Sequence, residues 1–226
     1  MKATRLRWHT GRVAEHTLIL LRHSKSDWTG DEVDIDRPLA KRGRRQAPEA
    51  GQWLATHVDR IDMAVVSTAK RARATWDLVS AELGERPETR HDDDAYGASA
   101  RELLDIIRNL GEELGTVVLV GHNPGLEGLA EALIGEWIPM PTSALAVIEL
   151  DGPWRSAGRA PELLRAAGRP PHGLIRRVQD GSAPVARSAP RHTAACRAQK
   201  PMSKPPPASP PPPSPPIDDA RGTIDT

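Results

Sequence analysis

Short runs of aliphatic residues, each bounded by polar residues, recur along the first 150 positions of the chain. These runs cover residues 18–21, 62–66, 116–120 and 144–150. Apolar runs of this length, almost without polar interruption, predict strands that are buried on both faces of a sheet. The pattern therefore indicates a sheet whose strands are separated by other elements.

Between the strands, apolar residues recur three or four positions apart, which is the spacing of amphipathic helices. The helical stretches cover residues 38–58, 72–83, 99–110 and 126–134. Pro48 lies inside the first stretch and predicts a kink or a restart there, and Ser99 followed by Glu102 is the pattern of a capping box. Strands that alternate with helices predict an α/β fold: a three-layer sandwich with a mostly parallel central sheet and helices on both faces.

The composition changes along the 226 residues and divides the chain into four parts. We predict an N-terminal extension over residues 1–15, a folded domain over 16–152, a partly ordered segment over 153–182 and a proline-rich tail over 183–226. The tail is nearly pure proline at residues 205–216. Such a segment cannot bury enough apolar surface to offset its loss of conformational entropy, so we expect it to be disordered.

Charge and composition exclude several classes of protein. The formal net charge of +1 argues against a dedicated nucleic-acid binder. No run reaches the about 20 apolar residues of a membrane span, and the apolar run at residues 17–21 is too short for a signal peptide. The single cysteine, Cys196, lies in the tail, so neither a disulfide nor a thiolate metal site is expected to hold the fold. We expect a soluble, cytoplasmic protein.

Candidate chemistry follows three of the predicted strands. Arg22 and His23 end the first, Ser67 ends the second with Arg71 one helical turn later, and His122 follows the strand at 116–120. Ligands bind outside the carboxyl ends of strands in open α/β sheets, so these side chains are expected to share one pocket. Arginines bind phosphoryl oxygens and a histidine nitrogen can attack phosphorus, so the set suits phosphoryl transfer.

The order and spacing of these motifs resemble the histidine phosphatase superfamily, the phosphoglycerate-mutase-like fold, and within it the small SixA-type phosphohistidine phosphatases. The matching segments are residues 21–28, 36–39 with 42–43, 67–75, 96–97 and 120–124. The resemblance covers residues 16–152. One departure is Ser24, which stands where most of the superfamily has glycine; its hydroxyl would either crowd the phosphate or add a donor.

The resemblance implies a role for each matching residue. His23 would be the nucleophile that is transiently phosphorylated, and Arg22, Arg71 and His122 would bind the phosphoryl oxygens. A nucleophilic histidine must be neutral, and the nearby arginines disfavour its protonation. The alternative for His122 is a histidine that only satisfies a Gly-His-Asn-Pro turn.

The general acid is less defined. Ester-cleaving members of the superfamily present a carboxylic acid just before a Tyr-Gly-like turn, and three aspartates precede Tyr96. The spacing favours Asp93, with Asp94 as the second choice, and neighbouring carboxylates raise the pKa of such a group. The alternative is a solvated acidic loop. Phosphohistidine needs less assistance from an acid, because its P–N bond is already labile.

We therefore expect a metal-independent, cofactor-independent phosphatase that works through a covalent phosphohistidine on His23. Residues 75–115 leave no room for a lid over the pocket, which favours a phosphohistidine carried by a protein. One alternative is a phosphatase for small phosphoesters or nucleotides. Another is a catalytically weak, phosphate-binding interaction module whose tail recruits partners that recognise proline. A dinucleotide-binding enzyme is disfavoured, because no Gly-x-Gly-x-x-Gly follows the first strand.

Overall fold

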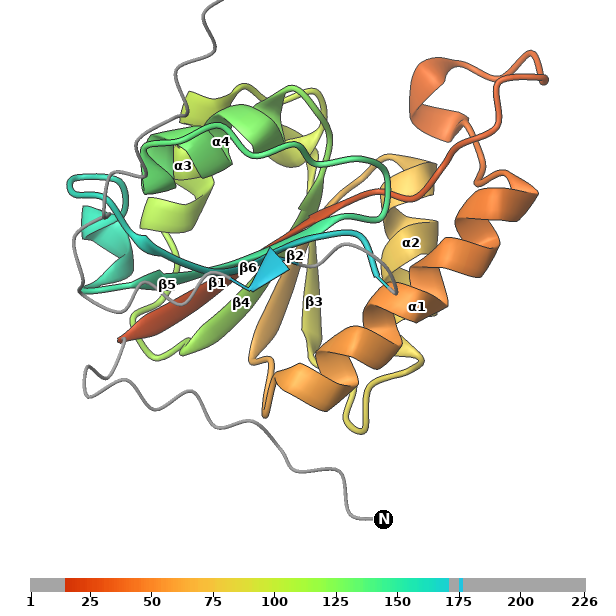
Figure 1. Ribbon diagram of the computed structural model, residues 1–226. Helices are drawn as coiled ribbons and strands as arrows, with labels where there is room; N and C mark the ends of the chain where they lie inside the picture. The colour runs from red at the N-terminus through yellow and green to blue at the C-terminus, as the bar shows by residue number, and fades with distance from the viewer. Residues whose placement is uncertain (1–14, 171–174, 177–226) are drawn as a thin grey trace, which may run out of the picture. The chain divides into compact units, whose positions relative to one another are not determined.

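The structure, a computed structural model, describes residues 15–170 and 175–176 (Figure 1). Its strands are β1 His16–Arg22, β2 Met63–Ser67, β3 Glu88–Asp92, β4 Thr116–Gly121, β5 Leu145–Leu150, β6 Leu163–Gly168 and β7 Ile175–Arg176. The α-helices are α1 Lys41–His57, α2 Lys70–Ser80, α3 Ala100–Arg108 and α4 Gly125–Ile134. Short 3-10 helices are η1 Asp34–Asp36, η2 Asp93–Ala95 and η3 Trp154–Ser156.

The strands form one seven-stranded sheet in the order β3-β2-β4-β1-β5-β6-β7. Strands β1 to β4 pair in parallel, whereas β5, β6 and β7 pair antiparallel, so the sheet is mixed. The parallel half places the carboxyl ends of β1, β2 and β4 at one edge. The α/β fold predicted from the sequence is confirmed, with the antiparallel strands added at one side.

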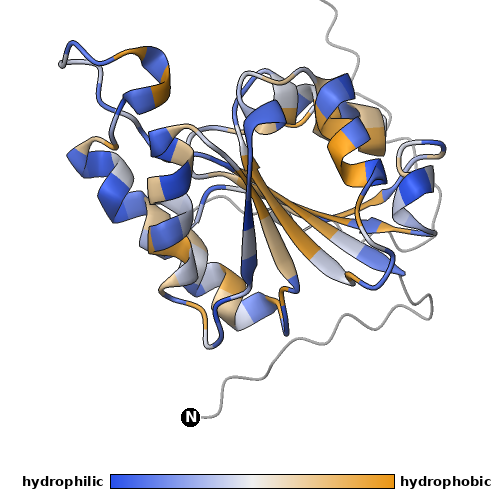
Figure 2. Cartoon of the chain, turned by 180° about the vertical axis from the view of Figure 1, so that it is seen from behind, coloured by the Kyte–Doolittle hydropathy of each residue, from blue (hydrophilic) through white to orange (hydrophobic). Residues whose placement is uncertain are grey.

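Two apolar layers separate the sheet from its helices, which cover both faces (Figures 1 and 2). Along β1, Leu18 and Leu20 point to the layer shared with α3 and α4. Ile19 and Leu21 point to the layer shared with α1 and α2. All four side chains are fully buried, as expected for a central strand of a covered sheet.

The first helix differs from its predicted extent. It begins at Lys41 rather than at Pro38, because the backbone around Leu39 pairs with Ser26 in an isolated antiparallel bridge. It then runs through Pro48 without a break, although proline removes one hydrogen bond of the helix. Buried residues on both sides of the proline hold the helix on the sheet. The capping box predicted at Ser99 is present at the start of α3.

Three strands were not predicted: β3, β6 and the short strand β7. Strand β3 has the sequence Glu-Thr-Arg-His-Asp and is largely exposed, so it contains no apolar run from which a strand could be predicted. Strand β6 lies beyond residue 152, so the sheet continues into the segment expected to be partly ordered. In the stretch before β6, Trp154 is buried and stacks against His16. The predicted extension before residue 15 and the tail over 183–226 lie outside the described residues. None of the described helices combines the length and apolar composition that crossing a bilayer requires.

Candidate active site

The two predicted histidines meet at the carboxyl edge of the parallel strands. Strands β1 and β4 pair in register, with Arg22 opposite Gly121, and the backbone N–H of His23 donates to the carbonyl of Gly121 at 3.1 Å. This register brings the rings of His23 and His122 to a centroid distance of 5.0 Å. Residues about a hundred positions apart therefore share one site, as the strand-end pattern predicts.

His23 is oriented by a single hydrogen bond. Its Nδ1–H donates to the carbonyl of Ser24 at 2.8 Å, since a carbonyl can only accept, and the lone pair is then on Nε2. Burial is the main reason that the pKa of His23 is lowered to about 3, and the charges of His122, Arg71 and Arg22 add to this effect. Burial contributes more to this lowered pKa than the arginines, which the sequence interpretation had invoked. The ring is thus neutral at physiological pH.

His122 is held by the end of β2. Its Nε2 lies 2.8 Å from the hydroxyl of Ser67, while its Nδ1 is buried and has no hydrogen-bond partner among the described residues. Burial lowers the pKa of His122 to about 4; the charge of Arg71 acts in the same direction and that of Asp34 opposes it. In this state His122 is neutral, with one buried nitrogen unpaired. An unpaired buried nitrogen is costly unless a ligand or water completes it.

A buried network fixes the backbone beneath His23. The N–H of Ser24 donates to the hydroxyl of Thr75 at 2.9 Å, and that hydroxyl donates to the carbonyl of Arg71 at 2.7 Å. The Ser24 hydroxyl lies 2.5 Å from the hydroxyl of Ser143. Ser24 and Ser143 are fully buried. The serine at the glycine position therefore uses its hydroxyl for structure rather than crowding the ligand side.

The predicted arginines lie at the same edge but are already engaged. Nη1 of Arg22 donates to the carbonyl of Met140 at 2.7 Å. The buried guanidinium of Arg71 donates to Asp34, through Nη1 to its backbone carbonyl and through Nη2 to its carboxylate. A further arginine, Arg37, also binds Asp34 and donates to the hydroxyl of Ser26 at 2.9 Å.

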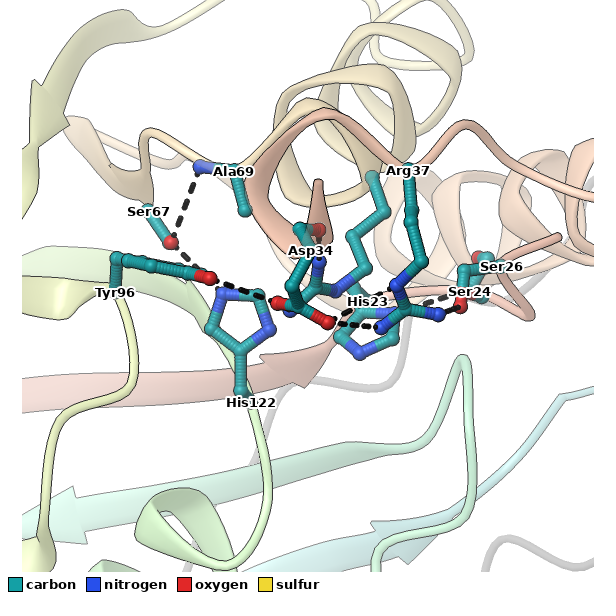
Figure 3. A network of polar contacts seen from close by, with 10 residues as sticks. His23, Ser24, Ser26, Asp34, Arg37, Ser67, Ala69, Tyr96 and His122 are labelled. Carbon is teal, nitrogen blue, oxygen red and sulfur yellow. Dashed lines mark hydrogen bonds and ion pairs between the residues drawn. The ribbon is translucent and has the colours of Figure 1, made fainter. Parts of the chain in front are cut away.

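The sequence interpretation missed Asp34 and Arg37 as parts of the site. Tyr96 was noted only for its turn, yet its hydroxyl donates to the Asp34 carboxylate at 2.8 Å (Figure 3). Hydrogen bonds from Tyr96, Arg37 and Arg71 hold the pKa of Asp34 well below its usual range. The one available signal was the Asp-x-x-Arg spacing from Asp34 to Arg37, which suits an ion pair within one helical turn.

The two candidate acids lie in the short helix η2, just before Tyr96. Asp93 and Asp94 are exposed in η2 and line an open hollow together with Tyr96 and Glu102. Neither side chain forms a hydrogen bond or an ion pair with the described site residues, which are His23, His122, Arg22 and Arg71. Among residues 15–170, no group of three or more histidine, cysteine, aspartate or glutamate side chains is arranged to hold a metal ion.

The mixed sheet, covered on both faces and carrying paired histidines at its carboxyl edge, defines a protein of the phosphoglycerate-mutase-like class. The sequence model of the histidine phosphatase superfamily (branch 1) matches residues 18–94. The chain belongs to this superfamily, and within it to the SixA-type proteins. This membership supports phosphatase activity.

Several relatives cover the folded part of the chain. An uncharacterized protein of Mycobacterium tuberculosis strain H37Rv is 35% identical over 145 residues, which are 59% of this chain and 89% of the relative. A structure assigned as the phosphohistidine phosphatase SixA from Agrobacterium tumefaciens has 33% identity and a TM-score of 0.56, covering 59% of this chain and 91% of that one. A structure with the same assignment from Nakamurella multipartitia has 29% identity and a TM-score of 0.60, covering 69% and 96%.

Proposed function

We propose that this protein removes a phosphoryl group from phosphohistidine on a partner protein, through a covalent phosphohistidine intermediate on His23. The observation that carries the proposal is the state of His23. It is buried and neutral, and its Nδ1–H is bound to the carbonyl of Ser24, so that Nε2 keeps its lone pair. A neutral imidazole with one oriented nitrogen is the form that nucleophilic catalysis requires.

In the first step Nε2 of His23 attacks phosphorus, and the bond from phosphorus to the substrate nitrogen breaks with its electron pair. The leaving imidazole takes a proton from solvent. In the second step the oxygen of a water molecule attacks phosphorus, and the bond to Nε2 breaks with its electron pair returning to that nitrogen. Inorganic phosphate leaves with one proton of the water, and the other proton returns to solvent. Arg22, Arg71 and His122 are the groups that would bind the phosphoryl oxygens, where charge is spread in the transition state.

The placement of the carboxyl groups supports phosphohistidine as the substrate. An ester oxygen leaves poorly without a proton donor, but Asp93 and Asp94 are exposed and form no hydrogen bond with the histidine cluster. The Asp34 carboxyl stays ionised, because its pKa is held low, so it is a poor acid. The labile P–N bond needs less help, and the SixA-type relatives bear the name of phosphohistidine phosphatases.

The test uses a histidine-phosphorylated protein and p-nitrophenyl phosphate, with a chelator present throughout. We expect turnover of the phosphoprotein by the full chain, an acid-labile phosphoenzyme on rapid quenching, and loss of both in His23→Ala. His91→Ala, which removes an exposed histidine of β3, is the matched control and keeps activity. Full activity in His23→Ala would refute the proposed nucleophile, and inhibition by the chelator would refute metal independence.

The same assay separates the substrate classes. Asp93→Asn and Asp94→Asn should slow p-nitrophenyl phosphate more than phosphohistidine if either aspartate donates a proton to the leaving group. We assign this role to Asp93 first. A preference for small phosphoesters would instead favour a small-molecule phosphatase. Phosphate binding without any turnover would favour a phosphate-recognising interaction module.

A further inference from the structure

The loop between β1 and α1 brings a carboxylate of the chain to the arginines of the site. Asp34 begins the 3-10 helix η1 in this loop, and its carboxylate accepts hydrogen bonds from three residues. Arg37 donates at 2.7 and 3.0 Å, Arg71 at 2.9 Å and Tyr96 at 2.8 Å. In Figure 3 the Asp34 side chain lies between Tyr96 and Arg37.

The bonds to Arg71 are of the kind that a phosphoryl group would make. Both terminal nitrogens of this buried guanidinium point to Asp34, one to the carboxylate and one to the backbone carbonyl. Arginine binds carboxylates and phosphates in the same two-pronged geometry. The remaining nitrogen, Nε, is buried and has no hydrogen-bond partner within the described part of the chain. In the ligand-free protein, Asp34 therefore holds the donors that Arg71 would offer to a substrate.

The charge of Asp34 opposes an incoming phosphoryl group as well. The neutral histidines leave Arg22, Arg37 and Arg71 as the cations of the site, and Asp34 cancels one of their charges. Like charges held within a few ångströms of each other are mutually unfavourable. A dianion that reaches Arg71 must either displace the carboxylate or bind beside it at a cost in affinity.

The segment that carries Asp34 is more exposed than Arg71, and Ile35 is the residue of η1 that packs against the core. No residue of η1 is buried, and Val33 just before it is 66% exposed. The Asp34 side chain is itself half exposed, whereas that of Arg71 is 6% exposed. Elements with few buried apolar contacts open at low free energy. Movement of Asp34 away from a fixed Arg71 is therefore the easier rearrangement.

We propose that Asp34 is an internal competitor for the phosphoryl subsite: its carboxylate occupies Arg71 in the free protein and is displaced when a phosphoryl group binds. The proposal rests on the proposed function for the class of ligand, an oxyanion of phosphorus. It predicts weak affinity for the inorganic phosphate product. Substrates that make further contacts outside the pocket, as a protein does, then have an advantage over small ones.

The test is binding of inorganic phosphate to the full chain by titration calorimetry at neutral pH, which needs no turnover. Asp34→Asn removes the charge with little change of shape and should bind phosphate about tenfold more tightly than the parent. Asp36→Asn is the matched control, because Asp36 is exposed two positions away and its side chain has no bonded partner among the described residues. It should change the affinity by less than about twofold, since exposed charges are screened.

A second variant, Asp34→Ala, removes the hydrogen bonds that an asparagine oxygen could still accept, and thermal melting verifies that both variants fold. Tighter phosphate binding by either folded Asp34 variant, with Asp36→Asn unchanged, supports competition. Unchanged or weaker binding in both overturns it and would make Asp34 a residue that positions Arg37 and Arg71. Turnover of phosphohistidine by the parent protein is measured separately. Turnover without tighter phosphate binding would keep the proposed function and reject the competition.

Discussion

Ser143 is the single residue with the most unusual backbone in the site. Its φ angle of 64° lies in the left-handed region, which a side chain with a Cβ rarely adopts. Its N–H points to the carbonyls of Arg22 and His23, at 3.2 and 3.3 Å, and its hydroxyl meets that of Ser24. The strained residue therefore ties together the backbone that presents His23.

Two substitutions at this position separate strain from hydrogen bonding. Ser143→Ala and Ser143→Gly both remove the hydroxyl, but only glycine accepts the positive φ without steric cost. We expect Ser143→Gly to be more stable than Ser143→Ala by about 1 kcal/mol, measured by urea unfolding. Equal stability of the two variants would show that the backbone at Ser143 stores no strain.

Residues that follow strands could be identified from the sequence, whereas residues of the long loop could not. Arg22, His23 and His122 are placed by the register of two apolar strands, and apolar runs are visible in a sequence. The position of Asp34 depends on how the loop folds back, with the backbone of Ser26 pairing with Leu39. That pairing has no periodic signal. The carboxylate nearest the arginines was therefore missed in favour of the aspartates before Tyr96.

At the scale of the elements, helix α1 packs closely against the loop that follows β1, and the contact is made at a glycine of the helix. Gly43 lies in the first turns of α1, and a Cβ at this position would collide with the backbone carbonyl of Lys25. Lys25 is two residues from His23, and its carbonyl accepts from the N–H of Ala40 at 2.9 Å. The close approach of helix and loop thus requires glycine.

Gly43→Ala should push the loop away from α1. We expect a loss of about 1 to 3 kcal/mol in the free energy of unfolding, the range for overpacking a tight contact, together with a lower kcat on phosphohistidine. Gly84→Ala serves as the control, since a Cβ there would meet no atom within 4 Å. If Gly43→Ala were as stable and active as Gly84→Ala, the contact with Lys25 would not constrain the loop.

The missed strand β3 and the unbroken course of the predicted helix α1 through Pro48 share a physical cause. Among the described strands, β3 pairs with β2 alone at the edge of the sheet, so it needs no apolar face, and its polar residues give no strand signal. Helix α1 passes Pro48 because Ala47 and Ala50 are fully buried on the sheet, and this tertiary contact outweighs the lost hydrogen bond. In both cases the environment, rather than the local pattern, determines the structure.

At the scale of the whole molecule, the fold buries two neutral histidines, His23 and His122, and its free energy of unfolding therefore depends on pH. The unfolded chain protonates both near pH 6.5, whereas in the folded protein the pKa of His23 is about 3 and that of His122 about 4. At pH values between the pKa of each histidine in the folded protein and its pKa in the unfolded chain, the unfolded state binds more protons than the folded state. Stability is therefore highest above pH 6.5 and falls as the pH is lowered toward 4.

The free energy of unfolding, measured in urea from pH 7.5 to 4.5, should decline below pH 6.5 with a slope that approaches about 1.4 kcal/mol per pH unit for each histidine. Other groups titrate in the same window, so the comparison is with a variant that carries His23→Asn and His122→Asn. This variant should lose the part of the slope due to the two histidines, whatever its stability at pH 7.5.

Asp34 does not interfere, because its lowered pKa makes it a source of stability that is lost only below about pH 4. A parent and a double variant with the same slope would mean that the two histidines are not held neutral by the fold. The lone pair on which the proposed attack depends would then be absent over much of the acid range.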